Sequence, residues 1–341
     1  MDDLKKKKIS PKFSILLEKL NKASEKKQMS LLLDHPWDEP IEGVWLKKRE
    51  NIAIYGTHYY DLASEEERRL LSVYETGAWW YTFIVFENLV SEYYMKIINH
   101  GTLKKFPDVV TYMHHFCKEE IIHAMVFRKA MTHFKITPFP IALNLREIYS
   151  HNAAMSEFPL KAVYLTILIE WLAENNAMED CNDKGISMLS RAIAVEHHKE
   201  EARHIEWGKN MIREFIDIVP EFIKEAQEIT APMIRSMLDM AVSSLVVYAR
   251  VGFENRAFRD YPQLITTVVN SENRKKINST IVAPMMRYFV ELGICDPENA
   301  ENMEIWKNNG FEQDVKEAVE YFKKKIDKDL DIDNVMNKNY N

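Results

Sequence analysis

Residues that interrupt helices are rare in this sequence. Its 341 residues include only 9 Gly and 12 Pro, while Leu, Ile, Ala, Glu and Lys are abundant. Good helix formers with few turn residues favour long helices over the short strands of a sandwich or barrel. We therefore expect an all-α fold that is large enough to bury a sizeable core.

Capping and turn residues predict four long helices in the first two-thirds of the chain. Ser64 is a good N-cap that precedes three Glu, and Pro107 with Asp108 suits the first turn of a helix. Short turns join the members of each pair, so we expect two antiparallel hairpins. The expected helices cover residues 64–99, 107–134, 157–181 and 186–219.

Each hairpin carries one Glu-x-x-His pair on its second helix. The pairs are Glu120 with His123 in the first hairpin and Glu201 with His204 in the second. Residues three apart share a helix face, but about one such pair is expected by chance. The two pairs become evidence for a metal site only if a further ligand lies opposite each of them on the first helix of its hairpin.

A lone Glu lies opposite each pair. Glu87 and Glu120 are each about 20 Å along their helices from the turn that joins them, and His197 and Glu201 straddle the level of Glu170. Both lone Glu residues follow apolar runs and have no basic residue three or four positions away. A carboxylate in such a place faces solvent or, if it is buried, needs a pairing group or a cation.

His197 extends the second pair to His-x-x-x-Glu-x-x-His on one helix face. A buried structural histidine is the alternative interpretation. Carboxylates and imidazoles without thiolates favour iron or manganese over a zinc–cysteine site. The candidate metal ligands are Glu87, Glu120, His123, Glu170, His197, Glu201 and His204.

This order of residues resembles the p-aminobenzoate N-oxygenase family of ferritin-like di-iron proteins. That family has a lone Glu, a Glu-x-x-His, a second lone Glu, and then His-x-x-x-Glu-x-x-His. The third histidine distinguishes it from ribonucleotide reductase small subunits, desaturases and bacterioferritins. The resemblance covers about residues 60–260 and implies a ferritin-like four-helix bundle with additional N- and C-terminal helices.

The resemblance also implies a reaction. Two Fe ions, cycling between Fe2+ and Fe3+, would activate O2 through a peroxo-di-iron(III) species and oxidise an aryl amine to hydroxylamine, nitroso or nitro products. Mn or a mixed Mn/Fe pair is the alternative metal content. We expect His197 to tune the oxidant. The sequence has no dinucleotide-binding fingerprint and no cysteine cluster, so the electrons come from a separate donor.

Two other functions fit the same ligands. A di-iron oxidase could hydroxylate a C–H bond, desaturate its substrate or cleave a C–C bond. A metal-storage or metal-scaffold protein is less favoured, because ferritin cages use much shorter subunits without extra C-terminal helices.

We expect three regions along the chain. Residues 1–60 form an N-terminal arm with a short helix. Residues 61–328 form a single helical di-metal domain, with the core bundle at 64–219 and extra helices at 221–258, 273–292, 297–309 and 311–328. Residues 329–341 form a flexible tail.

The net charge and the cysteine content indicate which binding partners and which cellular compartment to expect. The net charge of −7 gives no basic groove, so we expect no nucleic acid partner. The most apolar run, residues 158–169, is too short to span a membrane, and the charged first residues do not resemble a signal peptide. Three widely spaced cysteines indicate a reducing, cytoplasmic location. The added helices offer surface for a homodimer.

Some residues near the predicted site have no unique role. Glu174 shares the face of Glu170, and its alternatives are a proton donor or an additional ligand. We favour a residue that supports a ligand or has a structural role. Ala194 and Gly208 either leave room for substrate or permit close packing. An acidic substrate, which the resemblance implies, needs a basic partner. The candidates for that partner are Arg250, Arg256, Arg274 and Arg287.

Overall fold

The structure is a computed structural model. It describes residues 6–27, 29–30, 35–99, 101–140, 160–219, 221–242, 244–252 and 260–338. These residues form helices and turns and contain no strand, which confirms the predicted all-α class. Contacts divide the chain into two compact units. The first is Met1–Val219 with Asp239–Lys275, and the second is Pro220–Leu238 with Lys276–Asn341.

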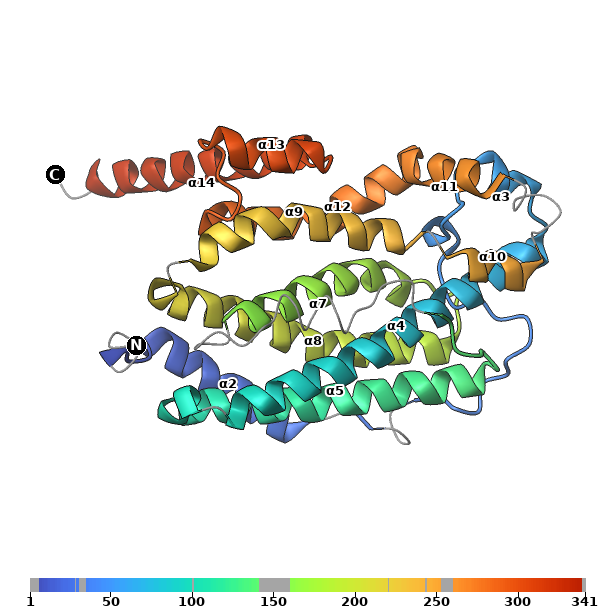
Figure 1. Ribbon diagram of the computed structural model, residues 1–341, viewed down its shortest axis with the longest axis horizontal. Coiled ribbons are helices and arrows are strands. Elements are labelled where there is room, and N and C mark those ends of the chain that lie inside the picture. The colour runs from blue at the N-terminus through green and yellow to red at the C-terminus, as the bar shows by residue number, and fades with distance from the viewer. Residues whose placement is uncertain are drawn as a thin grey trace. The chain divides into compact units, whose positions relative to one another are not determined.

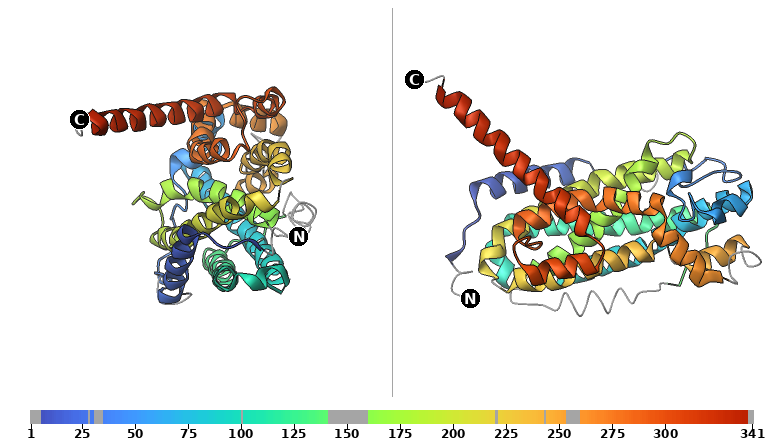
Figure 2. Two further views of the ribbon diagram at one scale, coloured as in Figure 1. Left: turned by 90° about the vertical axis from the view of Figure 1, so that its left-hand side faces the viewer. Right: turned by 90° about the horizontal axis from the view of Figure 1, so that it is seen from above.

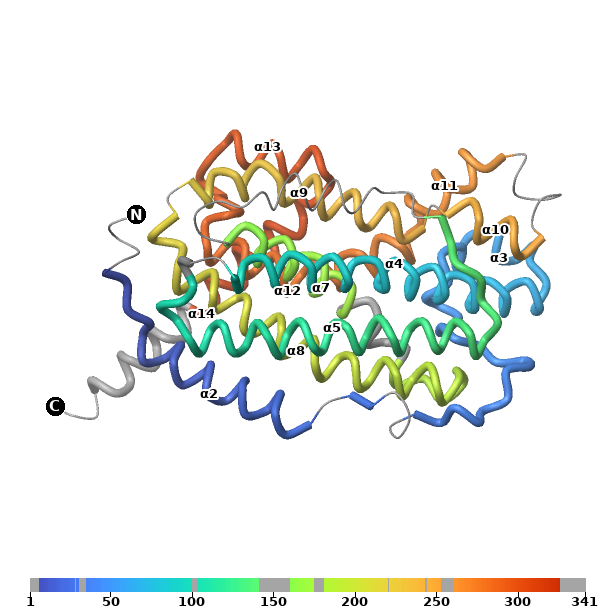
Figure 3. The backbone as a smooth tube through the Cα atoms, turned by 60° about the horizontal axis from the view of Figure 1, so that its bottom comes forward, coloured from blue at the N-terminus to red at the C-terminus, as the bar shows by residue number. Residues whose placement is uncertain are grey.

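Four long helices form the bundle of the first unit (Figure 1). The helices are α4 (Glu65–Asn99), α5 (Pro107–His133), α7 (Leu160–Cys181) and α8 (Met188–Phe215). α4 packs along α5 and α7 packs along α8, as the two predicted hairpins require, and α5 also contacts α8. An N-terminal helix, α2 (Pro11–Lys26), lies against α5 and α8 (Figure 3).

The start of α4 is fixed by the residues that the sequence indicates. The Ser64 hydroxyl accepts a hydrogen bond from the Glu67 backbone N–H at 3.2 Å, and the Glu67 carboxylate accepts one from the Ser64 N–H at 2.7 Å. This reciprocal arrangement is a capping box, which satisfies two N–H groups that the helix leaves unpaired. α4 then runs for 35 residues.

The start of α8 depends on a residue far away in the sequence. Ser187 is the N-cap and accepts a hydrogen bond from the Ser190 N–H. The carboxylate of Glu39 accepts hydrogen bonds from the backbone N–H groups of Met188 and Leu189 at 2.7 and 2.8 Å. A negative charge at a helix N-terminus is stabilising, so the N-terminal arm helps to place the helix that carries His197.

Aromatic side chains fill the bundle beyond the candidate metal ligands. Trp207 is fully buried and its ring contacts three other fully buried rings, those of Tyr94, Tyr112 and Phe116. Phe116 also stacks on His204, with ring centroids 3.8 Å apart. This packing holds one imidazole of the site in place.

The remaining helices are divided between the two units. Short helices of the first unit are α3 (His58–Leu62), α10 (Leu245–Val251) and α11 (Tyr261–Asn270), with 3-10 turns at Arg49–Asn51, Gly101–Lys105 and Ile216–Ile218. The second unit contains α13 (Ala300–Asn308), α14 (Glu312–Lys338), and most of α9 (Phe222–Met240) and α12 (Glu272–Leu292). Figure 2 shows α14 as one long helix.

Two predicted helix limits in this part are wrong. The expected helix over residues 221–258 ends at Met240 and resumes as α10, which ends where Gly252 adopts a left-handed backbone with φ of 82°. Glycine is favoured at such a helix end because it lacks a Cβ. The last helix continues to Lys338, past the predicted end at 328. The proposed domain limits otherwise stay a prediction.

One stretch of the described residues, Phe222–Val251, is long and apolar enough to meet a simple criterion for a membrane span. Core helices of soluble proteins meet the same criterion, and here a turn separates α9 from α10 within the stretch. This stretch is therefore only weak evidence for a helix that spans a membrane.

Candidate metal centre

The structure brings the seven predicted side chains together inside the four-helix bundle. None of them is more than 6 % exposed. They form two groups, and within each group one nitrogen or oxygen atom of every residue lies within 4.8 Å of the corresponding atoms of the others. Each group could hold one metal ion. The members are Glu87, His123 and His197 in the first group and Glu120, Glu170, Glu201 and His204 in the second.

The first group joins α4, α5 and α8. His197 Nε2 is 3.3 Å from Glu87 Oε1. His123 Nδ1 is 3.9 Å from the same oxygen. The two imidazole rings are 4.5 Å apart, so a carboxylate and two imidazoles face a common point.

The second group adds α7 and is richer in carboxylates. His204 Nδ1 lies 3.0 Å from Glu120 Oε1 and 3.2 Å from Glu201 Oε2. The other oxygen of Glu201, Oε1, lies 3.1 Å from His123 Nδ1 in the first group. Glu201 therefore directs one oxygen to each group, and its carboxylate is placed to bridge two ions.

The other ring nitrogen of each histidine is bonded to a further buried carboxylate. His123 Nε2 donates to Glu200 at 2.8 Å and His204 Nε2 to Glu119 at 2.9 Å. His197 Nδ1 donates to Glu174 at 2.8 Å. Such bonds fix the orientation and the tautomer of a metal-binding imidazole and raise its basicity. The interpretation of Glu174 as a residue that supports a ligand agrees with this geometry.

Sequence reasoning missed Glu119 and Glu200. They act across the hairpins, because Glu119 on α5 supports a histidine of α8, and Glu200 on α8 supports a histidine of α5. Arg203 lies between them, 3.1 Å from Glu119 and 3.5 Å from Glu200, and offsets their charge. The sequence does contain a pattern that could have indicated these two residues. Residues 118–123 and 199–204 both read Lys-Glu-Glu-x-x-His, so another Glu precedes each predicted Glu.

Burial and charge shift the acid–base equilibria of the centre. Burial raises the pKa of Glu87 to about 8. It raises the pKa of Glu170 as well, and the charges of Glu201 and Glu120 raise that pKa further. Burial opposes ionisation of Glu119 too, but the hydrogen bond and charge of His204 outweigh it and lower that pKa to about 2. Glu87 and Glu170 therefore need positive charge nearby to stay ionised. The histidines already supply it to the supporting Glu119 and also to Glu201, whose pKa lies well below its usual value.

The donor set fits a pair of divalent cations. Oε2 of Glu87, Oε1 of Glu201 and both oxygens of Glu120 and Glu170 find no hydrogen-bond partner among the described residues. Buried acceptors without donors are costly, and a cation satisfies them. Four carboxylates nearly neutralise two divalent ions, and oxygen with imidazole donors suits iron or manganese.

A comparison with family models agrees with this geometry. The model described as P-aminobenzoate N-oxygenase AurF matches residues 11–293. The chain belongs to the AurF family. The match spans all four bundle helices and both groups of the centre. No curated protein and no solved structure matches the chain. AurF-family membership places the chain among oxygenases, which use O2 and a small-molecule substrate.

The structure also assigns surroundings to the remaining candidate residues. Arg250 donates to the carbonyls of Thr137 and Pro138, and Arg274 is buried. Arg287 lies over a tyrosine ring in residues of the second unit, and Arg256 lies outside the described residues.

Proposed function

We propose that this AurF-family protein is a di-iron oxygenase that oxidises the nitrogen of an aryl amine. The observation that carries the proposal is the pair of buried Glu/His groups linked by Glu201. In the proposal all seven side chains are metal ligands. Iron is the proposed metal because the chemistry implied by the family requires a redox-active pair, which excludes an ion such as zinc.

The overall reaction determines what else the enzyme needs. Conversion of an amine to a hydroxylamine with O2 places one oxygen atom on nitrogen and releases the other as water, consuming two electrons and two protons. The electrons come from a separate donor, because the sequence has neither a dinucleotide-binding fingerprint nor a cysteine cluster. Bound iron would supply the binding and reduction of O2.

The chain's own residues have three tasks in this proposal. Glu119, Glu174 and Glu200 hold the three imidazoles in fixed orientations by hydrogen bonds to their outer nitrogens. The aromatic side chains around the centre exclude water, which strengthens electrostatic interactions there. Glu201 would offer one carboxylate oxygen to each ion.

Metal content and product analysis test the proposal together. We expect about two iron ions per chain. With a chemical reductant, O2 and p-aminobenzoate, the protein should give the hydroxylamine, nitroso or nitro product by mass spectrometry. The substitution His197→Ala should lower the metal content to about one ion per chain, since it removes one of the two imidazoles of the first group.

His198→Ala is the matched control. His198 donates to Glu174 at 2.6 Å, as His197 does at 2.8 Å, but it is about one-third exposed and belongs to neither group. It should retain the metal. Ring hydroxylation without nitrogen oxidation would support the alternative oxidase, and protein without bound metal would end the proposal.

A further inference from the structure

The outer surface of α5 exposes two neighbouring apolar side chains. Eight large apolar side chains are exposed among the described residues, and Ile121 and Met125 are the only two of these that lie one turn apart on one helix. Their exposed fractions are 47 % and 48 %. Single exposed apolar residues are common on protein surfaces, whereas neighbours on one helix face can form a contact surface.

This surface lies one helix width from the candidate metal centre. α5 carries Glu120 of the second group and His123 of the first, and both side chains are fully buried. Ile121 and Met125 point away from them, because successive residues of a helix are rotated by about 100°. A helix with its side chains is about 10–12 Å across, so a molecule that binds here comes within about that distance of both groups.

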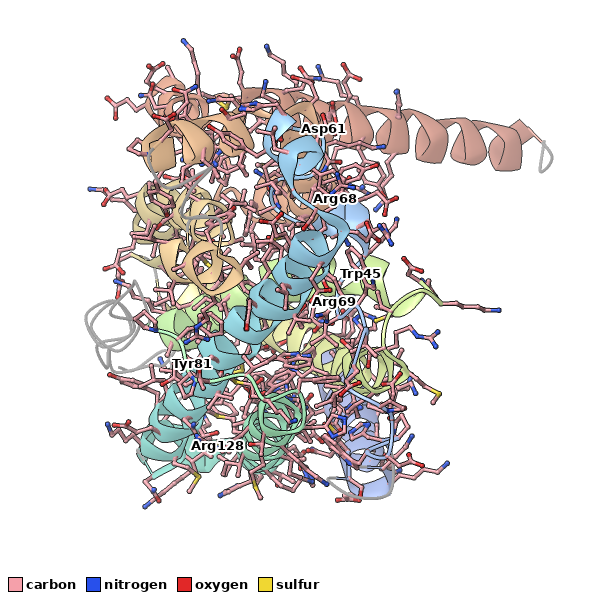
Figure 4. All side chains as sticks on the ribbon, turned by 90° about the vertical axis from the view of Figure 1, so that its right-hand side faces the viewer. Trp45, Asp61, Arg68, Arg69, Tyr81 and Arg128 are labelled. Atoms are coloured by element: carbon pink, nitrogen blue, oxygen red, sulfur yellow. The ribbon has the colours of Figure 1, made fainter. Side chains whose placement is uncertain are left out.

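Positive charge flanks the apolar pair. Lys118 precedes the pair by one turn, and Arg128 follows it by one turn on the same side of the helix. Arg128 is exposed at an edge of the bundle (Figure 4) and pairs with no acid among the described residues. The neighbouring acids of α5, Glu119 and Glu120, are buried. This surface is therefore positive, although the net charge of the chain is −7. We define the α5 face as Lys118, Ile121, Met125 and Arg128.

α8 also carries ligands of both groups, but its outer surface differs. Glu196 pairs with Lys27 and Lys199 at 3.0 and 2.6 Å, and Glu206 pairs with Lys209 at 3.0 Å. α2 also packs on this helix. Around its candidate ligands α8 presents paired charges, so the α5 face is better suited to an apolar contact close to both groups.

We propose that the α5 face is the docking surface for a small acidic one-electron carrier protein that reduces the centre, an inference that rests on the proposed function. Two carrier molecules, each losing one electron in turn, supply the two electrons that conversion of an amine to a hydroxylamine consumes, and water supplies the two protons. The positive flanks attract an acidic partner and accelerate its encounter. A small apolar contact suits electron-transfer complexes, which bury less than about 1,200 Å².

A second copy of this chain fits the α5 face less well. In a two-fold symmetric dimer the same surface meets itself. Both ends of the face carry a cation, so contact between the two apolar pairs would bring the positive flanks of one copy against those of the other. Like charges repel, which opposes a dimer at this surface and favours an acidic partner.

Calorimetric titration of the full-length protein with an oxidised, acidic plant-type [2Fe–2S] ferredoxin tests the proposal. The oxidised probe measures docking without electron transfer. We expect a Kd below about 1 mM. Met125→Glu and Arg128→Glu should each raise this Kd at least about tenfold, because each places a negative charge against an acidic partner. Both variants should keep their iron content and their rate of amine oxidation with a chemical reductant, because both side chains are exposed on the outside of α5.

Lys104→Glu is the matched control for a reversed charge. Lys104 is exposed and lies in the turn before α5, about 20 Å along the helix from Ile121. It should change the Kd by less than about twofold at 0.15 M ionic strength, where the Debye length is about 8 Å. Equal losses in all three variants, or no ferredoxin binding by the unsubstituted protein, would overturn the docking surface. A dimer in analytical ultracentrifugation that Met125→Glu dissociates would overturn it as well.

The same variants separate this proposal from the proposed function. Ferredoxin binding that depends on Met125 and Arg128 in a protein without iron would keep the docking surface and reject the oxygenase. Two iron ions per chain and amine oxidation with a chemical reductant, together with ferredoxin binding that is insensitive to both substitutions, would do the reverse.

Discussion

Each histidine of the centre uses both of its ring nitrogens. One nitrogen faces the inner carboxylates, and the other donates to a carboxylate outside them, as His123 does to Glu200. The outer bond places the proton of a neutral ring on the outer nitrogen and aims the inner nitrogen at the centre, which is what a metal ligand requires. At the scale of single residues, we therefore expect the supporting carboxylates to contribute to the metal affinity of the proposed centre.

The hydrogen bond from His123 to Glu200 predicts that substitution of Glu200 weakens the binding of iron. Glu200→Gln keeps the size of the side chain but removes the charge that supports His123, and we expect iron affinity to fall by about 10- to 100-fold. Competition with a chelator of known affinity measures the change. Glu196→Gln is the control, since Glu196 lies one turn earlier on α8 and pairs with Lys27 and Lys199. An equal loss in both variants would contradict the supporting role.

At the scale of helices, close packing of α7 on α8 brings Glu170 to the other ligands. A Cβ at Gly208 would lie 1.9 Å from Cδ1 and 2.4 Å from Cγ1 of Ile167. Gly208 therefore permits a close approach of the helices and does not leave room for substrate. Ala194, by contrast, lines a cavity of about 80 Å³ between residues of α4 and α8.

Gly208→Ala should therefore destabilise the protein. Overpacking costs about 1–3 kcal/mol, and the better helix propensity of alanine recovers up to about 1 kcal/mol of it. We expect a net loss of about 1 kcal/mol or more in denaturant unfolding. Adding Ile167→Ala removes the clashing atoms, so the double variant should be more stable than the sum of the single changes predicts. Additive effects would show that the close approach is not the cause.

At the scale of the whole molecule, the centre links metal content to stability. Four inner carboxylates share one buried volume, and burial already raises the pKa of Glu87 and Glu170. Ions that bind only the folded state stabilise it by about 3–4 kcal/mol when they are present at a hundred- to thousand-fold excess over Kd.

Metal removal should therefore lower the melting temperature. We expect a decrease of at least about 5 °C after dialysis against a chelator, and recovery when iron(II) is added back without oxygen. Differential scanning calorimetry measures both steps. A melting temperature that responds to neither step would contradict the link between the ions and folding.

The sequence alone determined the helical class, the two hairpins and the seven side chains that meet in the bundle. These features depend on local rules. Rare turn residues make long helices, capping residues such as Ser64 place their starts, and helical spacing puts Glu201 on the same face as His197 and His204. Once two hairpins are known, the level of each Glu follows from a fixed rise per residue.

Only the tertiary structure decided which group each ligand joins and which groups support it. Glu119 reaches His204 and Glu39 caps α8, and both contacts join helices or segments whose mutual position no local pattern specifies. Partners of this kind are set by side-chain packing across elements, for which the sequence has no periodic signal.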